Sequence, residues 1–270
     1  MLQNLHTHTN MCDGKNAPEE MIEKAIELGF DSLGFSAHAK TVFNTNWELR
    51  DTNGYVNKIT ELKEKYRGVI NLYLGAELDY FSSRDMFDIN FDYTIGSVHM
   101  CKSGDTQVDF DHTAEISKKH IDETFHGNSL AYVKSYYTLV ADLANKIDFD
   151  IVGHFDLITK FSEKHPELFD ANSKVYENEA LGALHSLREK KELFEVNTGA
   201  ISRGHRTTPY PAPFILEEMK RLKCKLVVTS DCHEKSWLDC NFNEAKEYIK
   251  AHGFDTLYYL TDKGFKGEKI

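Results

Sequence analysis

The chain opens with the stretch MLQNLHTHTNMCDG at residues 1–14, in which His6 and His8 stand two positions apart. In an extended strand, residues two apart point to the same side, so both imidazoles would share one face. Imidazole nitrogens suit zinc, iron or manganese, and such a pair needs carboxylates or further histidines to complete a metal site. The stretch alone predicts either half of a metal site or an edge strand with two exposed histidines.

Beyond this stretch, apolar runs of strand length alternate with segments of helical periodicity. The first helical segment lies between Pro18 and Gly29, which favour a helix start and a helix stop. The predicted helices span 18–28, 55–66, 130–147, 175–188, 214–222 and 242–251. The predicted strands span 1–5, 31–36, 70–76, 93–98, 151–153, 194–196 and 225–229, with a short strand at 256–260 before a charged tail. This alternation favours parallel βαβ units, in a closed barrel or an open doubly wound sheet.

Polar side chains follow the carboxyl ends of successive predicted strands. These residues are His6, His8, His38, Glu77, His99, His154, Asn197, Asp231 and His233. In an open sheet, only the strand ends at the switch point converge, whereas in a barrel all of them surround one mouth. We therefore expect an α/β barrel with a site at this mouth. No linker, repeat or low-complexity tract interrupts the alternation, so residues 1–270 are predicted to form a single domain.

The number of candidate ligands exceeds what one tetrahedral ion needs, so two or three clustered divalent ions are implied. Other histidines fall in predicted loops or on helix faces, where a structural or solvent-exposed role is expected: His112, His120, His126, His165, His185 and His252.

Composition narrows the possible functions. A net charge of −11 and a pI near 5.6 disfavour a surface that binds nucleic acid, since that binding requires clustered Lys and Arg, and favour a small substrate. No apolar run has the length of a membrane span, and we find no basic leader segment. The five cysteines are scattered without a CxxC pair. We therefore expect a cytoplasmic protein that acts without a membrane.

Residues 101–129 lack clear periodicity and are expected to extend over one end of the structure, where they could form a lid.

Six motifs in order resemble the polymerase and histidinol phosphatase (PHP) family. They are HTHTNMCDG at 6–14, SAHA at 36–39, GAELDY at 75–80, GSVHM at 96–100, GHFD at 153–156 and SDCH at 230–233. Within that family, the chain length and the insertion after GSVHM look most like the monofunctional histidinol-phosphate phosphatases. The resemblance implies a distorted (β/α)7 TIM-like barrel with a trinuclear metal site.

The resemblance also implies a role for each site residue. His6, His8, Glu77 and Asp231 would hold a first ion; Glu77, His99 and His154 a second; and Asp13, His38 and His233 a third. Many relatives have a histidine at the position of Asp13, so this ligand is a harder one here. A hydroxide held at Glu77, Asp231 and His233 would attack phosphorus, because metal coordination lowers the pKa of water.

Cations are also needed for the outer phosphate oxygens. The loop after residues 197–199 carries Arg203, His205 and Arg206. Arg203 is the favoured phosphate ligand, with His205 and Lys160 as further candidates. For Arg203 and Arg206 the alternative is a solvated basic loop. Side chains that recognise the imidazole and amine of the substrate stay open among Tyr80, Phe81, Asp156 and residues 101–129.

The implied activity is the hydrolysis of L-histidinol phosphate with zinc, manganese or iron. A PHP phosphatase or phosphodiesterase acting on nucleotides or nucleic-acid ends is the alternative. A non-catalytic, metal-stabilised module is less consistent with the sequence, because such a module is expected to lack some ligands and all nine ligand positions are filled here. An amidohydrolase barrel also begins with His-x-His, but it usually presents a lysine at a strand end, where Glu77 stands here. The oligomeric state stays open.

Overall fold

The computed structural model describes residues 1–43 and 45–270, and its centre is a sheet of seven parallel strands. In spatial order these are β1 (Gln3–Asn4), β2 (Ser32–His38), β3 (Asn71–Asp79), β4 (Tyr93–Ser97), β7 (Ile151–Val152), β8 (Leu193–Asn197) and β9 (Lys225–Thr229). The strands follow chain order around the sheet, which excludes the reversed order of a doubly wound fold. An isolated parallel bridge joins Thr7 to Cys232 and nearly closes the ring. The predicted seven-stranded barrel is confirmed.

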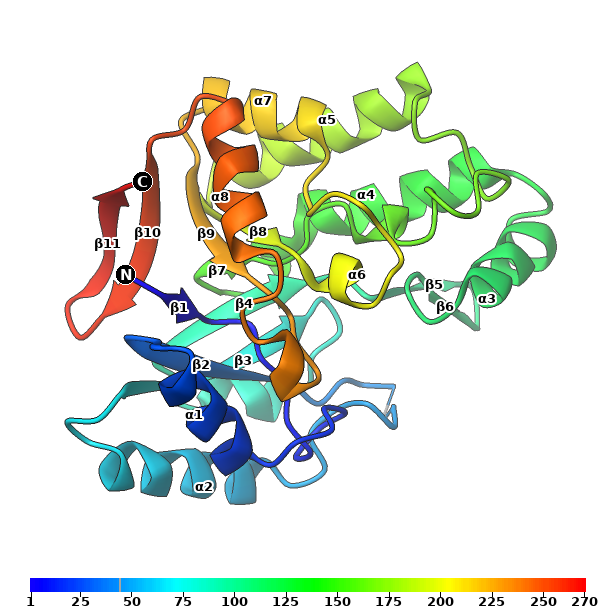
Figure 1. Ribbon diagram of the computed structural model, residues 1–270. Coiled ribbons are helices and arrows are strands. Elements are labelled where there is room, and N and C mark those ends of the chain that lie inside the picture. The colour runs from blue at the N-terminus through cyan, green and yellow to red at the C-terminus, as the bar shows by residue number, and fades with distance from the viewer. Residues whose placement is uncertain (44) are drawn as a thin grey trace.

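In the described part of the chain, six longer helices surround this sheet (Figure 1). They are α1 (Pro18–Glu27), α2 (Thr52–Lys65), α4 (Ser129–Lys146), α5 (Lys174–Arg188), α7 (Pro213–Arg221) and α8 (Phe242–Ala251). The shorter ones are α3 (Ala114–Lys119), α6 (Gly199–Ser202), three 3₁₀ turns (Arg84–Asp88, Leu157–Thr159, Lys235–Trp237) and a π turn (His120–Thr124). None of the helices in the described ranges is long and apolar enough to cross a membrane.

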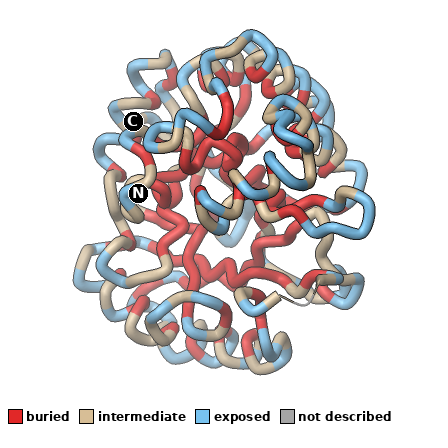
Figure 2. The backbone as a smooth tube through the Cα atoms, turned by 90° about the vertical axis from the view of Figure 1, so that its right-hand side faces the viewer, coloured by how far each residue is buried: buried red, intermediate tan, exposed pale blue. Residues whose placement is uncertain are grey.

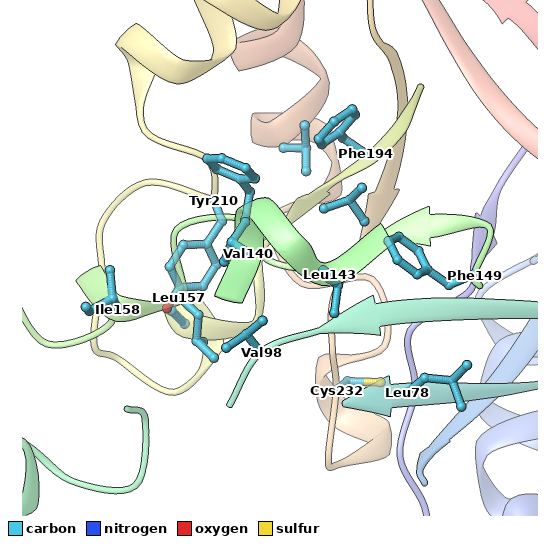
Figure 3. Close-up of a cluster of buried hydrophobic side chains, with 14 of the residues drawn as sticks. Leu78, Val98, Val140, Leu143, Phe149, Leu157, Ile158, Phe194, Tyr210 and Cys232 are labelled. Atoms are coloured by element: carbon cyan, nitrogen blue, oxygen red, sulfur yellow. The ribbon is translucent and has the colours of Figure 1, made fainter. Parts of the chain in front are cut away.

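The core has one apolar layer inside the barrel and another between the sheet and the helices. Inside, Tyr93 lies across Gly75, where a Cβ would come within 2.4 Å of the tyrosine ring. Outside, Val140 and Leu143 of α4 belong to the cluster that also contains Phe194 of β8 (Figure 3). Figure 2 shows the buried segments gathered in the centre and the exposed ones on the outer turns. This packing holds the strand ends in fixed positions.

The seam between the first and last barrel strands depends on Asn4, whose side chain is completely buried. Its Nδ2 donates to Ser230 Oγ at 2.6 Å and to the carbonyl of Leu238 at 2.9 Å. Its Oδ1 accepts from the backbone N–H of His6 at 3.0 Å. One amide therefore replaces the strand pairing that β1 and β9 do not complete.

We expect Asn4→Ala to lower the free energy of unfolding by about 3 kcal/mol, because it leaves several buried polar groups without partners. Urea unfolding of the metal-free protein measures this change. Asn10→Ala, at an exposed asparagine in the same stretch, serves as the control and should change stability by less than about 0.5 kcal/mol. Equal effects of the two substitutions would contradict this account of the seam.

Two predicted features near the surface are corrected. The charged tail is a strand, because β11 (Gly264–Lys269) pairs antiparallel with β10 (Thr256–Thr261). This hairpin lies at the end of the barrel where the termini lie, away from β5, β6 and α3 (Figure 1). The segment after His99 is partly regular, with a hairpin of β5 (Met100–Ser103) and β6 (Thr106–Asp109) before α3.

Glu77 was predicted to follow its strand, but it lies within β3, which continues to Asp79. The extension arises because Leu78 and Asp79 still pair with β4. Glu77 nevertheless reaches the mouth of the barrel.

Candidate metal centre

The structure brings all nine predicted ligand residues together at the carboxyl ends of the strands. Within four overlapping groups, one ligand atom per residue lies within 4.8 Å of the others. The groups are His8, Asp13, His38 and His233; His6, His8 and Glu77; His6, His154 and Asp231; and His38, Glu77 and His99. Shared members link the groups, so the arrangement is one continuous cluster able to hold more than one ion.

Glu77 lies at the centre of this cluster and is 1% exposed. Its Oε1 is 2.9 Å from His154 Nε2 and 3.2 Å from His99 Nε2. Its Oε2 is 3.1 Å from His6 Nε2 and 3.0 Å from His38 Nδ1. A carboxylate with a different set of imidazoles around each oxygen has the geometry of a bridging ligand.

Buried atoms without hydrogen-bond partners show that the cluster fits a cation. Among the described residues, Glu77 Oε2, His6 Nε2, His8 Nε2 and His38 Nδ1 are buried and unpaired. Buried polar atoms normally have partners, so four such atoms facing one another require an explanation. Imidazole nitrogens and carboxylate oxygens are the donor set of zinc, manganese and iron sites. The residues present therefore fit divalent metal ions.

Electrostatics in the cluster depend on both burial and neighbouring charge. Burial alone raises the pKa of Glu77, but His6, His38 and His99 outweigh it and hold this pKa well below its usual range. Burial, together with His233 and His38, lowers the pKa of His8 to about 3. Glu77 is therefore ionised and His8 is neutral at neutral pH. Neighbouring carboxylates raise the pKa of His6, His38 and His99 against the effect of burial, so metal binding would release protons from these three imidazoles.

Two carboxylates outside the predicted set contact candidate ligands from behind. Glu195 Oε2 lies 2.9 Å from His6 Nδ1, and Asp79 Oδ2 lies 3.2 Å from His99 Nδ1. The sequence interpretation missed both. A signal was present, because Glu195 is a charged residue inside an otherwise apolar strand and Asp79 follows Glu77 at the same-face spacing of two.

A cavity of about 310 Å³ opens beside the cluster. Its lining includes six of the nine candidate ligands together with Asn46, Trp47, Asp109, Asp111, His112, Leu157, Lys160 and Arg203. The segment 101–129 thus reaches the cavity, and His112, for which a structural or solvent-exposed role was expected, lies on its wall. Tyr80, Phe81 and Asp156 are not among the lining residues in the described part of the chain.

Arg203 and Lys160 both lie at this cavity, but their contacts differ. Arg203 Nη2 donates to Asp231 Oδ2 at 3.0 Å, and Nη1 donates to the Asp231 carbonyl at 2.8 Å. The Nζ of Lys160 donates to the carbonyl of Asp111 at 2.7 Å and lies 3.1 Å from its carboxylate. Both cations therefore border the space next to the candidate metal ligands.

His205 and Arg206 lie away from the cavity lining. The ring of His205 packs edge-on against Phe161, and burial with the nearby Lys160 lowers its pKa to about 4, so it is uncharged at neutral pH. Arg206 is buried, 3.7 Å from the Asp156 carboxylate, with its guanidinium over the ring of Tyr210. Arg206 therefore fits neither of the two alternatives predicted for this loop, a phosphate contact or full solvation.

Proteins of similar sequence carry one functional name. A protein of Schizosaccharomyces pombe named probable histidinol-phosphatase is 27% identical over 268 residues, which cover 92% of this chain and 85% of that protein. The histidinol-phosphatase of Bacillus subtilis is 25% identical over 250 residues, covering 85% of this chain and 92% of the relative.

A solved structure shares the fold. The histidinol phosphate phosphatase of Lactococcus lactis, complexed with zinc, L-histidinol and phosphate, superposes with a TM-score of 0.76 at 20% identity, covering 98% of both chains. The family model for the PHP domain matches residues 4–199, a range that contains seven of the nine candidate ligands and precedes Asp231 and His233. With the motifs, the barrel and the ligand cluster in agreement, the chain belongs to the PHP domain family.

Proposed function

We propose that this protein is a metal-dependent phosphomonoesterase that hydrolyses L-histidinol phosphate to L-histidinol and phosphate. The observation that carries the proposal is the cluster of nine ligand side chains around Glu77, which opens onto a cavity bordered by Arg203. The names of the similar proteins and the ligands bound to the Lactococcus lactis structure support the choice of substrate. The proposal includes a small phosphate ester as the binding partner and one domain over residues 1–270.

The proposed ligand sets are those that the resemblance implied. They are His6, His8, Glu77 and Asp231 for the first ion, Glu77, His99 and His154 for the second, and Asp13, His38 and His233 for the third. Bound divalent ions supply Lewis acidity and lower the pKa of coordinated water. Zinc is the first candidate because it is bound in the Lactococcus lactis structure, and manganese and iron suit the same donors.

The protein's own side chains bind and orient the phosphate. The guanidinium of Arg203 can donate to phosphate oxygens while its contact with Asp231 fixes its position beside the ions. Lys160 adds a second positive charge at the cavity wall. Glu77, Asp231 and His233 would hold the ions that lower the pKa of a coordinated water.

Thiol chemistry is disfavoured in this site. Burial raises the pKa of Cys12 and of Cys232 to about 12, so neither thiol ionises at neutral pH. Since the thiolate is the nucleophilic form, a phosphocysteine intermediate is not supported. Direct transfer of phosphate to water fits the residues better.

The cavity wall suits a cationic leaving group. Asp109, Asp111 and Trp47 line the cavity, and the Asp111 carboxylate also lies 3.1 Å from Lys160 Nζ. These groups match an amine and an imidazole better than a second phosphate, which supports histidinol phosphate over a nucleoside bisphosphate or an oligonucleotide end.

We expect L-histidinol phosphate to be hydrolysed with a kcat/KM at least about 100-fold above that of a nucleoside 3′,5′-bisphosphate or a short oligonucleotide, a difference of about 2.7 kcal/mol. Phosphate release from histidinol phosphate and the bisphosphate, and nucleotide release from the oligonucleotide, are measured with zinc or manganese present, and protein treated with a chelator serves as the control. Negligible release from histidinol phosphate, with rapid release from either nucleotide substrate, would replace this proposal by the nucleotide alternative.

A further inference from the structure

Glu195 is a completely enclosed carboxylate that contacts four different strand ends. It lies on β8, is 1% exposed, and points to the same side of the strand as Leu193, which belongs to the apolar layer inside the barrel. Burying a charge there is costly unless it is fully paired. A carboxylate retained at this depth therefore has partners that compensate for its desolvation.

Each oxygen of Glu195 has two partners. Oε1 accepts from the backbone N–H of His154 at 2.5 Å and from Asn197 Nδ2 at 2.8 Å. Oε2 accepts from Thr229 Oγ1 at 2.8 Å and lies 2.9 Å from His6 Nδ1. A carboxylate has about four acceptor positions, so its capacity is filled.

This arrangement determines which nitrogen of His6 carries the proton. A carboxylate only accepts, so Nδ1 of His6 must donate to Glu195, and Nε2 is the nitrogen that would face a bound cation. That Nε2 is buried, lies 3.1 Å from Glu77 Oε2 and has no hydrogen-bond partner in the described ranges. Carboxylates behind metal-bound histidines act in this way, fixing the tautomer and the ring orientation.

We infer that Glu195 is the positioning residue of the metal centre. Its carboxylate fixes the tautomer of His6 and, by accepting from the backbone N–H of His154, the place of that residue. This inference rests on the proposed metal site. Because Glu195 contacts His6 and His154 and not Asp13, His38 or His233, it acts on the first two ions and not on the third.

The test measures zinc alone, without substrate. Zinc is titrated into the metal-free protein in competition with a chromophoric chelator, for the wild type and for Glu195→Gln. We expect the affinity of the two ions near His6 and His154 to fall 10- to 100-fold, while the ion at Asp13, His38 and His233 binds as in the wild type.

Thr229→Val is the matched control, because it removes a donor to the same Glu195 oxygen and leaves the contact with His6 intact. Its zinc affinity should stay close to the wild-type value. Equal weakening in both variants, a uniform loss at all ions, or wild-type affinity in Glu195→Gln would each overturn the assignment. A wild-type protein that binds no zinc would instead overturn the proposed function and this inference together.

A second measurement does not require that Glu195→Gln folds. In zinc-loaded wild-type protein with ¹⁵N-labelled histidine, NMR identifies which nitrogen of His6 is protonated. The His6 signal is assigned as the one that is missing from the spectrum of His6→Asn. A proton on Nδ1 is expected. A proton on Nε2 would overturn the assignment even if Glu195→Gln cannot be prepared.

Discussion

Replacing Glu77 with Gln is expected to lower turnover of L-histidinol phosphate by at least about 10³-fold, since the loss of about 4 kcal/mol of metal-assisted stabilisation corresponds to that factor. Glutamine has nearly the same shape, so the fold should persist. It lacks the negative charge, however, that lies between His6, His38 and His99. The protein should also bind fewer metal ions per chain.

Elemental analysis and circular dichroism, together with phosphate-release kinetics, check this prediction. Glu64→Gln, at an exposed carboxylate that pairs with Arg67 on the surface, makes the same chemical change away from the site and should leave all three measurements unaltered. Full metal content with turnover within tenfold of the wild type would remove Glu77 from its proposed bridging role.

Replacing Arg203 with Ala is expected to lower kcat/KM by about 100-fold, mainly through a higher KM, because charge-assisted hydrogen bonds to phosphate contribute roughly 2–3 kcal/mol. Metal should stay bound. Asp231 loses the guanidinium, which is the main neighbour that lowers its pKa against the effect of burial, yet His6 and His8 still face its carboxylate.

Arg203→Lys separates charge from geometry. A lysine retains the positive charge but lacks the planar pair of donors, so its KM should fall between those of the wild type and Arg203→Ala. Arg221→Ala makes the same change of charge at an exposed helix position and should have no effect. If Arg203→Ala loses metal while the KM of the loaded fraction is unchanged, the residue supports Asp231 and does not bind phosphate.

The candidate ligands could be predicted from the sequence because the fold converts a one-dimensional pattern into a ring. His99 and His154 each follow a short apolar strand, and parallel barrel strands end at one mouth. The end of the strand at Glu77 was misplaced by three residues without consequence for the site, because β3 extends further than the apolar pattern indicates.

The supporting carboxylates could not be predicted in the same way. Glu195 contacts His6 across a separation of 189 residues, and periodicity carries no information about such a contact. The apolar residues around it indicate a buried strand but do not identify the partner of its single charge. The tail at β11 was misjudged because none of its six residues is buried, so its composition is that of a loop.

The seam that joins Asn4 to Ser230 across 226 positions has a consequence for biosynthesis. His6 and His8 emerge from the ribosome early, whereas Asp231 and His233 emerge only after β9 has been translated. A nascent chain therefore carries an incomplete chelating set for most of its synthesis. The proposed first and third ion sites can therefore be completed only after β9 has been translated, and a chain stalled before β9 would lack Asp231 and His233.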